Sequence, residues 1–311
     1  MAHPAHRALG APARQFFRQS AGLLFRPLAI LLLAVLPLTT ACAEQLGLVL
    51  SGGGGKGAYQ VGVWKALTEY GLAQQVTVMS GTSVGALNAA LFSCTRPGEA
   101  ERIWQEEVPD KLTKDAFISQ EGLQEILREV PLYKLMGSYP RICATAVQQR
   151  WIVGTLIQYI TASVGSYASR FWLNDEANSR WIEKDLLASS AFPGLCPAVT
   201  LADGRDYVDG GWEAVGGDNI PIDPLAETSP EVKNIFIIYC SGTPERRVKV
   251  KDYDWLRITE IIPTIDTAGL FDGTTNFSRN RIRLLIDTGY EDTVAILKGR
   301  GLYPVSSYWF E

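Results

Sequence analysis

The chain has 311 residues, of which 47% are hydrophobic and 20% are charged, and its formal net charge is −4. These proportions are ordinary for a globular protein, and the length fits one large domain or two small ones. Residues 1–43 hold four arginines and no acidic residue, so the remainder carries a charge of −8. An acidic remainder argues against nucleic-acid binding, which needs clustered Lys and Arg.

The first 43 residues have the layout of a targeting segment. An apolar run over residues 28–38 follows the basic stretch and is shorter than the roughly 20 residues that span a bilayer. Ala41-Cys42-Ala43 then offers a cleavage site with small residues. This order predicts a secretory signal peptide and export to the periplasm or the medium. An uncleaved membrane anchor and a lipid anchor on Cys42 are the alternatives.

From residue 46 onward, predicted strands alternate with predicted helices. Residues 46–51 and 75–80 are short apolar or β-branched runs that predict buried strands. Residues 57–70 and 84–92 have the composition and spacing of helices. This alternation predicts an α/β fold in which helices cover both faces of a mostly parallel sheet.

A glycine-rich loop, Ser51-Gly52-Gly53-Gly54-Gly55-Lys56-Gly57, joins the first strand to the first helix. Such a backbone can approach a ligand closely, and N–H groups at a helix start favour a negative oxygen. A phosphate-binding P-loop needs Gly where Leu50 stands and Ser or Thr where Gly57 stands. A dinucleotide-binding loop needs an acidic residue after the second strand, which closes on Met79-Ser80. We therefore interpret the loop as an oxyanion hole, with a plain glycine turn as the alternative.

Ser83 stands in Gly81-Thr82-Ser83-Val84-Gly85, between the second predicted strand and the second helix. This is the context of a nucleophile elbow. Because loops at the carboxyl ends of parallel strands meet at one edge of the sheet, we expect Ser83 close to the glycine-rich loop. A serine hydroxyl needs a base to accept its proton. The two histidines, His3 and His6, both lie in the predicted signal peptide.

The middle of the chain supplies the best candidate for that base. Residues 98–195 are predicted to be mostly helical with one strand near 141–147, and residues 198–209 predict a hairpin. Asp209 ends the hairpin, and Gly210 and Gly211 after it permit a close approach to another loop. A carboxylate accepts a hydroxyl proton over about 2.6–3.2 Å. Lys56 is better suited to holding its loop or neutralising charge, and Asp-Gly-Gly alone is also typical of a turn.

The last third of the chain completes the predicted fold. Residues 234–239 are β-branched and aromatic, which predicts a central strand. Beyond Asp254 the pattern is helical to near Gly301. Because no linker divides the chain, residues 44–311 are predicted to form one domain with a helical carboxyl-terminal part.

Four cysteines follow the predicted signal: Cys94, Cys143, Cys196 and Cys240. An even number in an oxidising compartment permits disulfides. A chain of this size can build its core without such links, so we favour buried free thiols. The chain has no Cys-x-x-Cys pair, and no histidine follows the signal, which argues against a zinc site.

In this order, the motifs resemble the patatin-like phospholipases. The resemblance rests on Gly-Gly-Gly-x-Lys-Gly at 52–57, Gly-x-Ser-x-Gly at 81–85 and Asp-Gly-Gly at 209–211, and it covers roughly residues 46–290. Ala-Ser-Ser-Ala-Phe-Pro at 188–193 and Asp-Asn-Ile-Pro at 218–221 add to it. The resemblance implies a three-layer α/β/α fold. One departure is residues 212–217, which join the Asp-Gly-Gly motif at 209–211 to the motif at 218–221 and form a longer connection than is usual in the family.

The resemblance also implies a chemistry. It implies a lipid acyl hydrolase of the phospholipase A type, which cleaves esters through a Ser–Asp dyad and an acyl-enzyme intermediate, without metal or cofactor. Ser83 would be the nucleophile and Asp209 the base, with the 52–57 loop as the oxyanion hole. The implied partners are a phospholipid or other lipid ester and a membrane surface as the substrate interface.

Three features leave alternatives open. The function could instead be hydrolysis of soluble acyl esters by a carboxylesterase or thioesterase, or lipid binding without catalysis. Residues 151–160 are either a buried element or a lipid-facing lid. Five aromatic residues could line an acyl channel or an interfacial surface, although such residues more often pack in a core: Trp151, Phe171, Trp172, Trp181 and Trp212.

Overall fold

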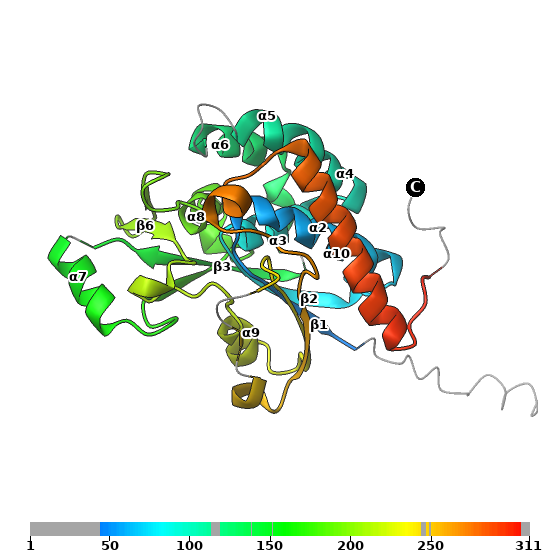
Figure 1. Cartoon of the computed structure of the whole chain (residues 1–311). Helices are drawn as coiled ribbons and strands as arrows, with labels where there is room; N and C mark the ends of the chain where they lie inside the picture. Colours follow the sequence, from blue (N-terminus) through cyan, green and yellow to red (C-terminus); the bar gives the residue numbers. More distant parts are fainter. Residues whose placement is uncertain are drawn as a thin grey trace, which may run out of the picture. The chain divides into compact units, whose positions relative to one another are not determined.

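The computed structural model describes residues 44–112, 119–137, 139–150, 152–243, 247–248 and 250–305. The predicted signal peptide, Trp151 and the last six residues lie outside this part. From Glu44 onward the chain forms one compact unit. Its centre is an eight-stranded sheet with helices on both faces (Figure 1), so the fold is the three-layer α/β/α arrangement that the sequence predicts.

The sheet is parallel at its centre and antiparallel toward one end. Followed from one hydrogen-bonded pair to the next, the strands connect in the order β5-β6-β3-β2-β1-β7-β8, and β4 pairs with the other edge of β3. Strands β3, β2, β1, β7 and β8 run parallel, whereas β4, β5 and β6 form antiparallel pairs. The strands are β1 (Leu46–Leu50), β2 (Val76–Thr82), β3 (Arg141–Gln148), β4 (Ala168–Trp172), β5 (Val199–Thr200), β6 (Asp206–Asp209), β7 (Asn234–Ile238) and β8 (Arg257–Ile261).

Helices α2, α3, α8 and α10 lie on one side of the sheet and α9 lies on the other (Figure 1). The alternation of side chains along β1 shows both cores: Leu48 and Leu50 pack on the side of α2 and α3, while Val49 packs with Leu225 of α9. The helices are α2 (Ala58–Glu69), α3 (Val84–Cys94), α4 (Pro97–Arg102), α5 (Val108–Leu112), α6 (Gln120–Glu129), α7 (Ile152–Thr161), α8 (Ile182–Ser189), α9 (Asp223–Thr228) and α10 (Arg279–Gly299).

Two strands were not predicted. Strand β8 overturns the expectation of helix throughout the chain beyond Asp254, although α10 confirms its last part. Strand β4 lies in a region predicted to be helical apart from β3. Both strands are short and form their ladders with β7 and β3, so distant pairing decides their structure. Strand β7 pairs on both edges, with β1 and β8, which confirms the predicted central strand.

The four cysteines that follow the predicted signal have free thiols in the structure, as expected. Cys94, Cys143 and Cys240 are buried, and Cys196 is half-buried. Burial raises the pKa of the Cys94, Cys143 and Cys240 thiols to about 12. Each is therefore held as the neutral thiol. None of the described helices combines the length and the apolar character that a bilayer span requires.

Candidate active site

Strand β3 brings Ser83 and Asp209 together. Strand β2 pairs with it so that Thr82 lies opposite Thr145, and β6 pairs with it so that Asp209 lies opposite Ala146. Strand β4 runs along one edge of β3 past both positions, so β2 and β6 must share the other edge. The two strands therefore end beside neighbouring residues of β3, and Ser83, which follows Thr82, meets Asp209.

Ser83 has the backbone of a sharp turn. Its φ of 54° and ψ of −127° place a non-glycine residue at positive φ, a conformation that persists only where surrounding contacts hold it. The hydroxyl of Ser189, which is fully buried, supplies such a contact. It accepts a hydrogen bond from the Ser83 N–H at 3.0 Å and donates one to the Thr145 carbonyl at 2.7 Å. Ser189 lies in the motif at residues 188–193, and nothing in the sequence of that motif indicates this role.

The two glycines of the elbow are required by close packing. A Cβ on Gly81 would lie 2.4 Å from the carbonyl carbon of Gly85, and a Cβ on Gly85 would lie 2.1 Å from the Leu50 carbonyl oxygen. Helix α3 can therefore begin directly against the ends of β1 and β2. The Gly-x-Ser-x-Gly spacing thus follows from backbone contact between the helix and the strands.

Asp209 is a buried carboxyl, 4% exposed, at the end of β6. Burial raises its pKa from 3.8 to about 6, and hydrogen bonds with the Ser83 side chain and the Gly211 N–H act in the opposite direction. The Gly211 N–H donates to Oδ1 at 2.7 Å. A Cβ on Gly210 would lie 2.2 Å from the Thr145 carbonyl oxygen, so this glycine lets the loop pass close to β3.

The residues of the glycine-rich loop fall into two groups. Gly52, Gly53, Gly54 and Lys56 line the cavity that contains Ser83 and Asp209. Gly55 and Gly57 pack elsewhere, because a Cβ on Gly55 would meet the Asn276 carbonyl at 2.4 Å and one on Gly57 would meet Val84 at 2.3 Å.

The hydrogen bonds of the loop show which of its backbone N–H groups could still bind an oxyanion. The Gly52 N–H already donates to the Asn219 side chain, at 3.1 Å, and the Lys56 N–H donates to the Gly53 carbonyl at 3.2 Å. Among the described residues we find no acceptor for the N–H of Gly53 or Gly54. The Lys56 ammonium donates to the Ala268 carbonyl at 3.1 Å, which agrees with a role in holding the loop.

A buried network of polar side chains holds the two ends of the glycine-rich loop in place. The Gln60 side chain donates to the Ser51 carbonyl at 2.8 Å, and the Asn88 side chain donates to the Gly57 carbonyl at 3.0 Å and to the Gln60 oxygen at 2.8 Å. The Trp104 indole N–H completes it by donating to Asn88 at 2.9 Å. These partners come from α2, α3 and the π-helical turn η3 (Ile103–Glu107). No motif in the sequence marks them.

The cavity has a volume of about 580 Å³ and a polar end at Ser83 and Asp209. This volume is within the range of about 300–1,000 Å³ usual for ligand pockets. Away from the polar end its wall is apolar and is formed by α3, η3, α5 and α6. The apolar lining residues include Leu87, Leu91, Ile103, Trp104, Val108, Leu112, Leu123, Ile126, Leu127, Val130, Leu132 and Phe277.

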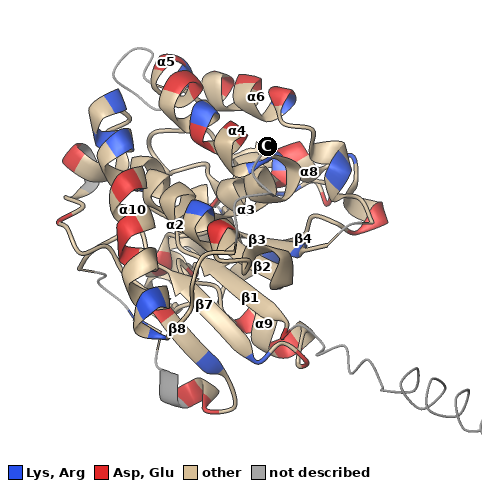
Figure 2. Ribbon diagram, turned by 90° about the vertical axis from the view of Figure 1, so that its right-hand side faces the viewer, with Lys and Arg blue, Asp and Glu red and all other residues tan. Residues whose placement is uncertain are grey.

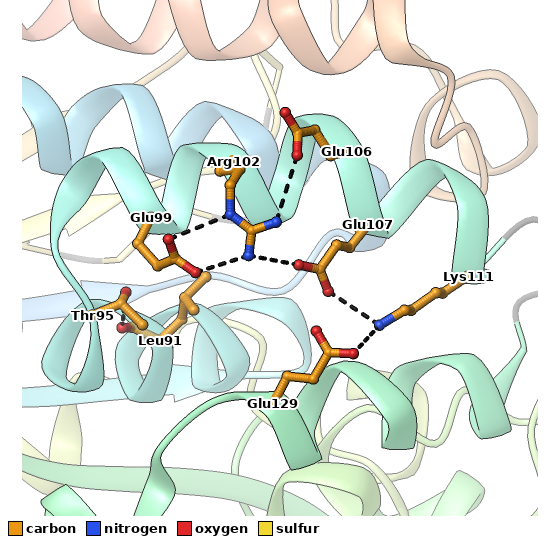
Figure 3. Close-up of polar contacts among 8 residues, drawn as sticks. All are labelled: Leu91, Thr95, Glu99, Arg102, Glu106, Glu107, Lys111 and Glu129. Atoms are coloured by element: carbon orange, nitrogen blue, oxygen red, sulfur yellow. Dashed lines mark hydrogen bonds and ion pairs between the residues drawn. The ribbon is translucent and has the colours of Figure 1, made fainter.

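The outer side of this helical wall is charged. Figure 2 shows Lys, Arg, Asp and Glu spread over α4, α5, α6 and α10. In Figure 3, Arg102 pairs with Glu99 at 2.8 Å and with Glu107 at 2.7 Å, and Lys111 pairs with Glu107 at 3.1 Å and with Glu129 of α6 at 2.5 Å. The network links α4 to α6 across the outside, so the wall presents apolar groups to the cavity and charges to water.

The five aromatic residues that the sequence suggests for an acyl channel have different surroundings in the structure. Trp212 lines the cavity and is 38% exposed. Phe171 packs edge-on against Tyr207, Trp172 lies under the Arg141 guanidinium and Trp181 lies beside Lys184. Trp151 lies outside the described residues. The acyl-channel reading therefore fits Trp212, and the channel wall comes mainly from aliphatic residues of the helices.

With this geometry established, comparison with known proteins places the chain. The model of the patatin-like phospholipase family matches residues 48–226, which is more than half of the chain. The chain belongs to this family. The match covers the glycine-rich loop, the elbow at Ser83 and the Asp209 turn, so it confirms the resemblance seen in the motifs.

Individual relatives are more distant. Patatin-like phospholipase domain-containing protein 7 of Rattus norvegicus is 26% identical over 181 residues, which is 58% of this chain and 12% of that protein. Lysophospholipase NTE1 of Cryptococcus neoformans is 26% identical over 209 residues, which is 63% of this chain and 11% of that protein. The chain therefore spans only about a tenth of the length of these relatives.

A solved structure shows the same fold. VipD from Legionella pneumophila superimposes with a TM-score of 0.53 at 15% identity, covering 82% of this chain and 67% of that one. At this identity the likeness concerns the fold alone. It agrees with the α/β/α layers described above.

Proposed function

We propose that this protein is a lipid acyl hydrolase of the phospholipase A type, with Ser83 as nucleophile and Asp209 as general base. One observation supports the proposal most directly: a serine at positive φ and a buried aspartate, at the ends of strands that β3 brings together, both line the polar end of an apolar cavity. Membership of the patatin-like phospholipase family supports the reaction class. Relatives named lysophospholipase support a lipid substrate.

In the proposed first step, Ser83 Oγ attacks the ester carbonyl carbon while its proton passes to Asp209. The N–H groups of Gly53 and Gly54 stabilise the oxyanion of the tetrahedral intermediate, an effect worth about 10²–10³ in rate for each donor. The ester C–O bond breaks as Asp209 returns its proton to the leaving alcohol. Water then attacks the acyl carbon of the acyl-enzyme while Asp209 accepts a proton from it. The bond from the acyl carbon to Ser83 Oγ breaks as Asp209 returns this proton to Oγ, and the carboxylic acid leaves.

The pKa of Asp209 suits this role. A base must be ionised before the reaction yet basic enough to accept a proton, which is best met by a pKa close to the working pH. Burial brings the pKa of Asp209 to about 6. The deeply apolar wall supports a long acyl chain as the group bound beyond Ser83, and a membrane surface as the place where such chains are presented.

Labelling with a fluorophosphonate probe tests the dyad. We expect the wild type to label, Ser83→Ala not to label, and Asp209→Asn to label far more slowly. Asp185→Asn is a matched control, because Asp185 is also buried with a raised pKa but does not line the cavity. A panel of phospholipids, lysophospholipids, short soluble esters and thioesters then separates the lipase from the esterase alternative.

Two outcomes would decide against the proposal. A wild type that does not label under any activating condition would contradict the dyad. A Ser83→Ala variant that keeps the full biological activity would favour the non-catalytic lipid-binding alternative. Export remains a separate proposal, which amino-terminal sequencing of the mature protein tests.

A further inference from the structure

Over residues 156–160, helix α7 exposes four apolar side chains and buries a polar one. Leu156 is 57% exposed, Ile157 52%, Tyr159 64% and Ile160 72%. Gln158, in the middle of this run, is 2% exposed, and its amide donates to the Gln148 carbonyl at 3.4 Å. The polar residue therefore faces the protein, and the aliphatic and aromatic residues face outward.

This arrangement is the reverse of a helix on the surface of a water-soluble protein. At 3.6 residues per turn, the four exposed apolar residues cover an arc of about 160°, and Gln158 points the opposite way. Surface helices normally turn their apolar stripe to the core and their polar residues to solvent. Contiguous exposed apolar surface of this kind marks a site of interaction. The outward side of α7 is therefore built for an apolar neighbour.

Helix α7 packs against a loop that lines the cavity. It packs against the turn η7 (Glu213–Val215), which follows Trp212. The chain after α7 binds the same loop, since the Gly165 N–H donates to the Gly217 carbonyl at 2.8 Å and the Tyr167 N–H to the Gly216 carbonyl at 2.9 Å. Trp212 lines the cavity that contains Ser83. The apolar surface is therefore joined through one short loop to the site.

The charge pattern indicates what the neighbour is. Residues 151–169 contain no Lys, Arg, Asp or Glu. Of the two flanking arginines, Arg150 lies over the Tyr167 ring at 5.4 Å, and Arg170 is paired with Asp223 and Glu227. The surface thus offers apolar groups and tyrosines without an excess of either charge. Helices that lie in a membrane interface bury such a face among the acyl chains.

We propose that α7 is a membrane-docking element that inserts its outward face into a zwitterionic phospholipid bilayer and holds the cavity-lining loop at Trp212 close to the lipid surface. The helix lies in the plane of the interface, with Tyr159 at the headgroup level and Leu156, Ile157 and Ile160 among the acyl chains. This inference rests on the proposed function for its purpose, because a lipid substrate is what docking would deliver to Ser83. Of the two alternatives for residues 151–160, it takes the lipid-facing one for the part that α7 covers, and Trp151 lies outside the described residues.

The test uses hydrogen exchange on the full-length chain carrying Ser83→Ala, so that no lipid is consumed. Vesicles of phosphatidylcholine are expected to slow exchange of the α7 amides. In the double variant Ile157→Glu, Ile160→Glu we expect this vesicle-dependent protection to be at least about tenfold weaker, because two aliphatic groups no longer enter the bilayer. Leu284→Glu is the matched control, since Leu284 is 48% exposed on α10. It should leave the protection intact.

Several outcomes overturn the inference. Unchanged exchange of α7 in the presence of vesicles would do so, even if another segment anchors the chain. Protection of α7 that appears without vesicles as the protein concentration rises would identify a second copy of the chain as the neighbour. Equal loss of protection in the Leu284→Glu control would show a general effect of added charge.

Hydrolysis of a water-soluble short-chain ester separates this inference from the proposed function. With Ser83 intact, the double variant should hydrolyse that ester like the wild type and lose activity only on vesicles. A wild type that docks but hydrolyses no ester would contradict the proposed function and leave docking in place. A wild type that hydrolyses esters without protection of α7 would contradict docking alone.

Discussion

Helices α6 and α7 have similar lengths and opposite orientations of their apolar residues. In α6, Leu123, Ile126 and Leu127 are buried and line the cavity, while Glu129 faces outward and pairs with Lys111. In α7, over residues 156–160, the four apolar side chains face outward and Gln158 faces the protein. The difference teaches that apolar content alone does not identify a core helix. What decides is which side of the helix the rest of the chain covers.

The largest expected effect is at the polar end of the cavity that α6 encloses. Asp209→Asn removes the proposed base and should lower kcat/KM on a soluble ester by about 10²–10⁴-fold. The same change should stabilise the fold at pH 8 by at most about 3 kcal/mol, because the buried carboxylate is the disfavoured form there. Ester hydrolysis and urea unfolding measure the two effects.

The sign of the stability effect follows from the pKa. The pKa of Asp209 is about 6 in the folded protein, against an ordinary value of 3.8, so the folded state holds its proton more tightly. Below about pH 4 the protonated Asp209 carboxyl costs the folded state nothing, and the free energy of unfolding falls as the pH rises from about 4 through 6 and the buried group ionises. Asp209→Asn should gain stability at pH 8 and none near pH 4. Asp185→Asn should gain stability in the same direction and keep its activity.

The next effect compares the two helices directly. Ile126→Ala in α6 should destabilise the fold by about 2–5 kcal/mol, since it truncates a buried side chain of the core. Ile157→Ala in α7 should change the free energy of unfolding by less than about 0.5 kcal/mol, as at other exposed positions. Urea denaturation without lipid measures both. Similar losses at the two positions would contradict the contrast between the helices.

A smaller effect concerns pH. Because the proposed base must be ionised, kcat/KM should fall about tenfold for each pH unit below the pKa of Asp209, which is about 6. A monomeric soluble ester is the right substrate, since it does not depend on docking by α7. Activity that stays constant from pH 7 down to pH 4 would speak against a carboxylate base. The Asp185→Asn variant should show the same profile as the wild type.

The smallest effect is expected on the charged outer side of the cavity wall. Glu99→Gln removes one partner of Arg102, and both side chains are well exposed, at 47% and 43%. Exposed ion pairs contribute about 0.2–1 kcal/mol, so the free energy of unfolding should change within that range and less at high salt. A loss above about 2 kcal/mol would show that the outer network holds the wall of the cavity.

Much of the fold and of the site follows from local patterns. The βα units around residues 46–92 were predicted because buried parallel strands are uniformly apolar and glycines mark the turns between strand and helix. The turn at Asp209 was predicted from the hairpin before it and the two glycines after it, and the central strand β7 was predicted from its β-branched and aromatic residues. Ser189, Asn219 and the Gln60–Asn88 pair were not assigned roles, because a single polar residue in a helix or loop gives no sign of its partner.

The sequence by itself determined the family and the α/β class, and it pointed to Ser83 and Asp209 as the proposed dyad, because no histidine follows residue 43 and a carboxylate is then the natural base for an elbow serine. Only the tertiary structure decided that Ser83 and Asp209 meet. They do so because β2 and β6, more than a hundred residues apart, end beside neighbouring residues of one edge of β3. It also decided which loop glycines reach the cavity and which side of α7 is exposed, because covering by distant segments leaves no mark in a local pattern.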